Sequence, residues 1–210
     1  FHGSMDRYFQ AKASLFRFGF SDLAIINIDD TYGAKLLTQI DIPAVTISRA
    51  GKADWFFEEI TKFNRGTSVK IRGRDGILIE GTTKLLGDYN LDNLLMAVAI
   101  AVISGIDPIE ISSNLQLYTG APGRMEQVEL GQNFMAFVDY AHTSDATINV
   151  LKSAREFTSG KLIAVLGCGG DRDKSKRPLM GQALTLADYP IFTSDNPRSE
   201  DPHQILKEMT

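Results

Sequence analysis

Two charged loops near the end of the chain follow short apolar runs: KLIAVLGCGGDRDKSKRPLMG (residues 161–181) and YPIFTSDNPRSEDP (residues 189–202). The first run has the length of a strand and turns at GCGG (167–170), whose glycines let the backbone bend sharply and let a ligand approach closely. A helix is predicted over about 178–187 and a second strand over 190–193. In a parallel α/β sheet both loops would lie at the carboxyl ends of strands, where such folds bind ligands. We therefore expect the two loops to form one site.

The two motifs, GCGGDRDKSKRPLMG (167–181) and TSDNPRSEDP (193–202), resemble the Mur ligases of peptidoglycan synthesis. More narrowly, they resemble the members of that family that add meso-diaminopimelate. In those members the DNPR tetrapeptide, here residues 195–198, is the recognition motif for meso-diaminopimelate, and lysine-adding relatives carry a different tetrapeptide. Both motifs match in order and spacing, and the resemblance extends through nearly all 210 residues. It implies a ligase of cell-wall biogenesis.

Composition excludes several other classes of protein. A net charge of −4 gives the chain no global basic field, so neither nucleic acid nor an anionic lipid surface is an expected partner. The single cysteine, Cys168, excludes an internal disulfide and suits a reducing cytoplasm. Because no apolar run reaches the length needed to span a bilayer, no membrane insertion is expected. We expect a cytoplasmic monomer.

The pattern of apolar residues predicts an α/β chain with an antiparallel insertion. Alternation in VKIR (69–72) and ILIE (77–80), joined by the turn sequence GRDG (73–76), indicates a hairpin. A loop of helix and strand breakers, TGAPG (119–123), is the candidate domain boundary. The remaining predicted elements are helices over 4–16, 31–39, 91–104, 108–117 and 144–157, strands over 23–28, 44–47, 125–129 and 134–138, and a final helix from 202.

The resemblance explains the order of these predicted helices and strands, because they match parts of two consecutive domains. Residues 1–119 resemble the later half of a Mur ligase central, ATP-binding domain, through FHGSMDRYFQAKASLF, AIINIDD and GDYNLDNLLMAVAIA. Residues 120–210 resemble the first part of the C-terminal, amino-acid-binding domain, which has a Rossmann-like topology, through APGRMEQVE and VDYAHTSDA. The family's uridine-nucleotide domain, GKT phosphate loop and GKGHE-type segment have no counterpart in these residues. We therefore expect a central-to-C-terminal fragment that is inactive alone.

The reaction implied by the resemblance is ATP-dependent amide formation on UDP-MurNAc-L-Ala-D-Glu. ATP converts the substrate carboxylate to an acyl phosphate, and the amine of meso-diaminopimelate then attacks and expels phosphate. The protein would neutralise phosphate charge with Mg²⁺ and cations, and would hold the reactants in line. Lys12, in YFQAK, matches the family's lysine that is carbamylated by carbon dioxide, which turns a cation into an oxygen ligand for Mg²⁺. Without the resemblance, Lys12 is a solvated charge on an amphipathic helix.

Four residues are candidates for ATP binding. The resemblance implies that Asn93 contacts adenine, although Asn90 and Asn93 flank a predicted helix start and capping is the alternative. Arg124, in GRME, matches an arginine that faces ATP, or else is a surface arginine after a loop. Asp139, in VDYAH, leaves a strand end as a ribose-binding acid does, while capping of the following helix is equally open. The nearby His142 could also approach the nucleotide.

Specificity for the amino acid is expected from Arg172 and Arg198. Meso-diaminopimelate differs from lysine chiefly by a second carboxylate on its distal stereocentre, which a planar guanidinium can hold in a bidentate fork. Asn196 can donate to that carboxylate and accept from the distal ammonium, while Asp195 holds the loop or attracts the ammonium. Pro197 stiffens the turn. Without the resemblance, DNPR is a turn with a surface arginine.

Three further features receive structural interpretations. The basic cluster of Lys174, Lys176 and Arg177 is predicted to be a solvated helix start. Trp55 is expected to pack in a β element. Because no matching base is identifiable for Cys168, we expect a packing thiol rather than a nucleophile.

Two rival functions stay open on the sequence. An oxidoreductase could use the glycine turn for a dinucleotide, but GCGG (167–170) misses the GxGxxG spacing, and no acidic residue ends a following strand in the expected place. The chain could also act as a non-catalytic module that binds a nucleotide or an amino acid. A stability shift with a nicotinamide dinucleotide would indicate the first function, and binding without ATP turnover would indicate the second.

Overall fold

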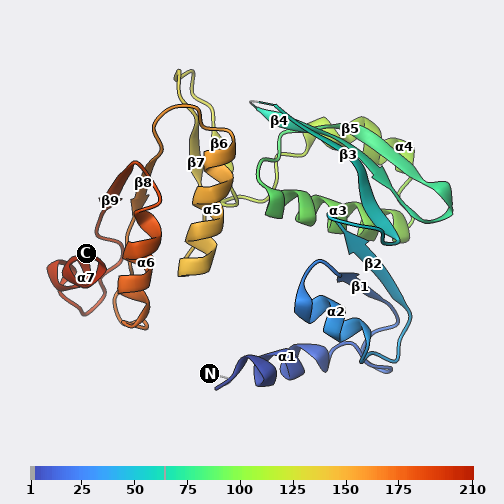
Figure 1. The fold of residues 1–210 in the computed structure, drawn as a ribbon, viewed down its shortest axis with the longest axis horizontal. Coiled ribbons are helices and arrows are strands. Elements are labelled where there is room, and N and C mark those ends of the chain that lie inside the picture. Colours follow the sequence, from blue (N-terminus) through green and yellow to red (C-terminus); the bar gives the residue numbers. More distant parts are fainter. Residues whose placement is uncertain (1–2, 64) are drawn as a thin grey trace. The chain divides into compact units, whose positions relative to one another are not determined.

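The computed structural model describes residues 3–63 and 65–210, so Phe1, His2 and Asn64 lie outside the description. The chain divides into two compact units, Phe1–Thr119 and Gly120–Thr210 (Figure 1). Each unit mixes helices and strands, which confirms the predicted α/β class. In the described part of the chain, none of the helices is long and apolar enough to cross a membrane.

The first unit is built on a five-stranded mixed sheet in the order β1-β2-β3-β4-β5. The first three strands run parallel, and β3, β4 and β5 run antiparallel. A 3-10 turn joins β4 to β5, so the predicted hairpin is confirmed. The bounds are β1 Ala24–Asn27, β2 Ala44–Ser48, β3 Trp55–Phe63, β4 Gly66–Arg72, turn Arg74–Gly76 and β5 Leu78–Thr83.

Helix α3 (Asp88–Ile103) packs against β1, β2 and β3 and forms the main core with them (Figure 1). Trp55 is 2% exposed in this core, which confirms its predicted packing role. Helix α4 (Pro108–Asn114) and the 3-10 turn Leu115–Leu117 pack along β5. Burial of apolar area is the main favourable term in such packing. The core includes Val45, Ile47, Ile71, Ile79, Leu91, Leu95 and Val98.

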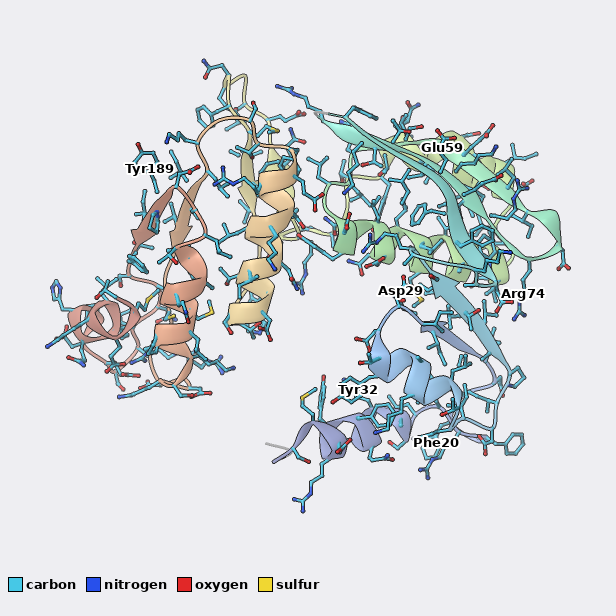
Figure 2. The ribbon with its side chains drawn as sticks, viewed as in Figure 1. Phe20, Asp29, Tyr32, Glu59, Arg74 and Tyr189 are labelled. Atoms are coloured by element: carbon cyan, nitrogen blue, oxygen red, sulfur yellow. The ribbon has the colours of Figure 1, made fainter. Side chains whose placement is uncertain are left out.

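Two short helices lie beside the β1 edge of the first unit. Helix α1 (Met5–Ala13) begins at Ser4, whose Oγ accepts from Arg7 N at 3.2 Å, so the predicted N-cap is confirmed. Asp30 is the N-cap of helix α2 (Thr31–Leu37). Tyr32 projects from α2 towards α1 (Figure 2), and its ring centroid lies 5.5 Å from that of Phe9. These contacts join α1 to α2.

The second unit contains the predicted strand–helix–strand unit. Strands β8 and β9 run parallel, with Ile163 opposite Tyr189, and α6 connects them. Helix α6 packs against α5 and α7, and β6 and β7 form a separate antiparallel pair (Figure 1). The bounds are β6 Glu126–Val128, β7 Ala136–Val138, α5 Ser144–Glu156, β8 Ile163–Leu166, α6 Lys176–Leu184, β9 Tyr189–Phe192 and α7 Pro202–Met209.

Helix α2 approaches β1 so closely that only glycine fits at the contact. A Cβ placed on Gly33 would lie 1.9 Å from the carbonyl oxygen of Asn27. Because that atom belongs to the backbone of a strand, it cannot move aside as a flexible side chain could. The absence of a side chain at Gly33 therefore sets the position of α2 on the sheet.

We expect Gly33→Ala to lower the free energy of unfolding by about 2 kcal/mol, as overpacking does when backbone must shift. Chemical unfolding followed by circular dichroism would measure it. The matched control is Gly51→Ala, because a Cβ there meets nothing closer than Ser48 Oγ at 3.7 Å. Equal stability of the two variants would contradict the close contact.

Candidate functional site

Two loops of the second unit lie backbone against backbone, as the sequence predicts for its two charged motifs. The glycine loop (residues 167–175) follows β8, and the DNPR loop (residues 193–201) follows β9. Gly170 N donates to Asn196 O at 2.9 Å. A Cβ on Gly170 would lie 1.8 Å from Pro197 O, so this approach requires glycine. The parallel strands thus bring both loops to one edge.

Side chains add a second set of contacts between these loops. The Asp171 carboxylate accepts from Ser199 Oγ at 2.7 Å and from Ser199 N at 3.3 Å. In return, Asp171 N donates to Glu200 Oε1 at 2.7 Å. Asp171 holds a left-handed φ of 52°, which costs free energy and persists only where neighbouring contacts support it.

Arg177, near the start of α6, is buried beneath the two loops. It is 1% exposed and forms a two-pronged pair with Glu200, at 2.8 and 3.0 Å. The same guanidinium donates to Glu208 Oε2 at 2.6 Å and to Gly169 O at 3.4 Å. The prediction of a solvated helix start is therefore wrong for Arg177. The cause is two acidic partners from distant parts of the sequence, which make burial of the charge tolerable.

The Arg177–Glu200 pair also controls the ionisation of both groups. Hydrogen bonds from Arg177, from Lys174 and from Asp171 N lower the pKa of Glu200 from 4.5 to about 2. The bonds to Glu200 and then Glu208 raise the pKa of Arg177 above its ordinary value. Lys174 reaches Glu200 at 3.0 Å with its own side chain 62% exposed. Glu200 is therefore the acidic centre that joins the two loops.

Arg172 and Arg198 differ from Arg177 in being exposed. Within residues 3–63 and 65–210, no salt bridge joins either guanidinium to a carboxylate. A Cβ on Gly169 would lie 3.6 Å from Asn196 O, 3.8 Å from Asp195 Oδ2 and 3.9 Å from Arg172 Cγ, so these groups surround one point. The structure thus gathers Arg172, Asp195 and Asn196 beside Gly169.

The DNPR turn is held by its own asparagine. Asn196 Oδ1 accepts from Arg198 N at 3.3 Å, and Arg198 has a left-handed φ of 51°. Pro197 is half-buried against Gly170, in keeping with its predicted stiffening role. The amide NH₂ of Asn196 and the second lone pair of its Oδ1 can both meet a ligand.

Cys168 lies in the same loop and is half-buried. Burial is the main cause that raises the pKa of its thiol, and Asp195 adds to the rise while Arg177 opposes it. A raised pKa keeps the sulfur protonated and weakly nucleophilic. This environment supports the interpretation of a packing thiol.

Arg124 lies in the loop that precedes β6, and Asp139 directly follows β7. Asp139 Oδ2 accepts from Met125 N at 2.9 Å, and Asp139 Oδ1 accepts from Ala141 N at 2.8 Å. Thr143, not Asp139, caps α5, so the capping alternative for Asp139 is wrong. Arg124 is exposed directly before Met125. The half-buried Asp139 carboxylate thus bonds the backbone of the segment after β7 to that of the segment before β6.

His142 is exposed, and its ring contacts Tyr140, two residues earlier in the chain. Its Nδ1 lies 3.1 Å from Tyr140 O, and its ring meets the Tyr140 ring edge-on at 5.8 Å. The remaining Nε2 is the nitrogen that could reach a ligand.

In the first unit, Asn93 is exposed on α3 while Asn90 is buried. Asn90 Nδ2 donates to Leu86 O at 3.0 Å, and the N-cap of α3 is Gly87. The helix begins three residues earlier than predicted, so neither asparagine is a cap. Asn93 therefore keeps the accessibility that contact with a base requires.

Asp29, to which the sequence assigns no role, holds the segment after β2 that carries Arg49. It accepts from Ser48 Oγ at 2.6 Å and from Arg49 N at 2.7 Å, and Figure 2 shows it at the carboxyl end of β1. Arg49 in turn donates to Asp88 and Asp92, both at 2.9 Å. These charge-assisted bonds fix the first turns of the helix that carries Asn93. The IINIDD segment was the available sequence signal.

Lys12 is exposed on α1, with its Nζ 5.7 Å from the centre of the Tyr8 ring. Residues 3–63 and 65–210 contain no group of three or more His, Cys, Asp or Glu side chains that could hold a metal ion. Mg²⁺ is commonly bound by one or two carboxylates together with substrate phosphates. An accessible Lys12 would, once carbamylated, act as one such carboxylate ligand.

The architecture is shared with solved structures of a MurF ligase and of a folylpolyglutamate synthetase. A MurF ligase from Thermotoga maritima in complex with ADP superposes with a TM-score of 0.71 at 18% identity, over 98% of this chain and 47% of that one. The folylpolyglutamate synthetase of Lactobacillus casei gives 0.66 at 16% identity, over 94% and 50%. At these identities the likeness shows the fold alone, which is that of the Mur and folylpolyglutamate ligases.

Family models identify both units. The Mur ligase middle domain matches residues 1–101, and the Mur ligase glutamate ligase domain matches residues 123–210. The chain belongs to the Mur ligase family.

Relatives of higher identity carry one name, UDP-N-acetylmuramoyl-L-alanyl-D-glutamate–2,6-diaminopimelate ligase. Those of Streptomyces coelicolor and Synechocystis sp. are each 44% identical, over 212 and 218 residues. A solved structure with this name gives a TM-score of 0.65 at 38% identity, over all of this chain and 44% of that one. This chain spans 42% of the length of both curated relatives.

The lowered pKa of Glu200 predicts an acid-sensitive second unit. Because the folded-state pKa is depressed, its stabilising effect is complete above pH 4.5 and is lost as the pH falls towards about 2. Chemical unfolding between these pH values should therefore show a smaller acid loss in Glu200→Gln than in wild type. Glu110→Gln, which removes an exposed carboxylate of α4, serves as control and should follow wild type. Parallel curves for all three proteins would refute the assignment.

Proposed function

We propose that the protein is an ATP-dependent carboxylate–amine ligase that adds meso-diaminopimelate to UDP-MurNAc-L-Ala-D-Glu. The observation that carries the proposal is the docking of the glycine loop on the DNPR loop, which leaves Arg172 and Arg198 exposed and without carboxylate partners among the described residues. The diaminopimelate ligases to which the chain is 44% identical support the same substrate.

The loop chemistry suits the distal end of meso-diaminopimelate, which carries both a carboxylate and an ammonium. A guanidinium from Arg172 or Arg198 binds the carboxylate through two parallel N–H bonds, with the Asn196 amide as a further donor. The Asp195 carboxylate, beside Gly169, attracts the ammonium. L-Lysine has the ammonium but lacks the distal carboxylate, so it leaves the guanidiniums unpaired. The unpaired guanidinium charge therefore favours meso-diaminopimelate over L-lysine.

The remaining candidate residues would contact ATP and Mg²⁺. Asn93 would contact adenine, Asp139 the ribose hydroxyls, and Arg124 the phosphates, with His142 at the edge of the nucleotide. Mg²⁺ would supply charge neutralisation at the phosphates, and carbamylated Lys12 would offer it one oxygen ligand. Transfer of the γ-phosphoryl group to the dipeptide carboxylate leaves ADP and an acyl phosphate. Attack by the free amine then forms the amide bond and releases phosphate.

Arg198→Ala should lower the affinity for meso-diaminopimelate by about ten- to a hundredfold, the usual effect of losing a charge-assisted pair. Affinity for L-lysine should not change. Calorimetry on the complete polypeptide encoded by the gene would measure both, with Lys176→Ala as the matched loss of a nearby positive charge. Equal binding of the two amino acids, unchanged in Arg198→Ala, would exclude the assignment.

Lys12→Arg keeps the charge of the side chain but cannot be carbamylated. We expect it to reduce ligase activity of the complete polypeptide by about a hundredfold or more, since charge stabilisation at the phosphates is lost. Added bicarbonate should raise wild-type activity and leave the variant unchanged. Lys35→Arg, which keeps the positive charge of the exposed ion pair between Lys35 of α2 and Asp6 of α1, is the control and should be nearly neutral. Full activity of Lys12→Arg would overturn the role.

A further inference from the structure

Glu200 is bonded at once to the glycine loop, to α6 and to Lys174, although it lies on the DNPR loop. Its two oxygens accept from Asp171 N at 2.7 Å, from Arg177 at 2.8 and 3.0 Å, and from Lys174 at 3.0 Å. Its side chain is only 14% exposed. It lies two residues after Arg198 in the chain, and Asp171 lies directly before Arg172. The contact therefore joins the residue next to Arg172 with a residue two positions from Arg198.

Both of those arginines sit beside backbone that needs external support. Asp171 and Arg198 have left-handed φ values of 52° and 51°, each outside the range that these residues prefer. Such conformations cost free energy and persist when surrounding contacts impose them. The bonds of Glu200 and Ser199 to Asp171 support the first of these conformations, and the bond from Arg198 N to Asn196 Oδ1 supports the second.

We propose that Glu200 and the buried Arg177 are positioning residues that lock the glycine loop and the DNPR loop into one clamp before substrate binds. The proposal rests on the proposed function, because the clamp presents Arg172 and Arg198 to the distal carboxylate of the amino acid. Preformed loops avoid the free-energy cost of ordering two charged segments on binding. Loosening them weakens recognition of that carboxylate without touching the ligand directly.

The chain offers a matched control in Glu208. Its Oε2 accepts from the same guanidinium, Arg177 Nη1, at 2.6 Å. Its other oxygen accepts from Gln204 within α7, and among the described residues the hydrogen bonds of Glu208 go to Arg177 and Gln204 and not to either loop. Glu208→Gln therefore weakens the same buried arginine while the loop-to-loop bonds stay in place. A purely structural role for the Arg177 cluster predicts the same result for both glutamates.

The experiment compares wild type, Glu200→Gln, Ser199→Ala and Glu208→Gln in the complete polypeptide. Ser199→Ala removes the exposed Ser199–Asp171 bond with little risk to folding. Steady-state kinetics would give KM for meso-diaminopimelate, for ATP and for the UDP-linked dipeptide. Hydrogen exchange, resolved by residue, would report the amides of 168–172 and 195–200.

We expect Glu200→Gln to raise KM for meso-diaminopimelate about tenfold or more, with KM for the other two substrates within about twofold. The amides of both loops should exchange at least about tenfold faster in Glu200→Gln and less so in Ser199→Ala. Glu208→Gln should lower the melting temperature while its KM for meso-diaminopimelate and its loop exchange stay near wild type. Equal effects of Glu200→Gln and Glu208→Gln on KM and exchange would overturn the clamp.

Failure of the proposed function has a different signature. If wild type joins no amino acid to the UDP-linked dipeptide, or uses L-lysine as well as meso-diaminopimelate, the proposed function falls and the specificity role falls with it. If wild type selects meso-diaminopimelate and Glu200→Gln selects it equally well with unchanged exchange, the clamp alone falls.

Discussion

The second unit depends on one buried guanidinium. Removing a charge from water is expensive, and Arg177 is 1% exposed, so it needs several acceptors at hydrogen-bond distance. Glu200 and Glu208 supply acceptors from the DNPR loop and from α7, and Gly169 O accepts a further bond. Among the described residues, Arg177 Nε stays buried without a hydrogen-bond partner. A single side chain thereby connects the helix that follows one loop to the segment that follows the other.

The first unit uses the same principle with a different set of residues. Arg49, at the end of β2, pairs with Asp88 and Asp92 in the first turns of α3, and Asp29 binds the backbone of Arg49. Carboxylates in the first turns of a helix also suit its dipole. In each unit, partly buried arginine–carboxylate bonds hold a loop or helix that carries candidate ligand groups. Polar residues such as Asn93 and Arg172 thus stay exposed.

Much of the fold could be predicted because its signals are local. Apolar runs, turn glycines and capping residues located the β4–β5 hairpin, the Ser4 cap and the strand–helix–strand unit around α6. The errors arose where a partner distant in sequence decides. Arg177 was predicted to be solvated because its carboxylate partners lie 23 and 31 residues later. The capping alternative for Asn90 is wrong because α3 begins earlier than predicted, at Asp88. Arg49 and Lys62 pair with the Asp88 carboxylate there.

By itself the sequence determined the family, the two charged motifs and the chemical character of the site. Residue types and their spacing carry that information, since a guanidinium or a glycine turn has its properties in any chain. Only the tertiary structure decided which charged side chains are exposed and which are buried in pairs with carboxylates. Arg172, Arg177 and Arg198 are alike in sequence, yet two are exposed and one is buried among carboxylates. That distinction depends on the approach of β8 and β9, which brings segments about 30 residues apart into hydrogen-bond range.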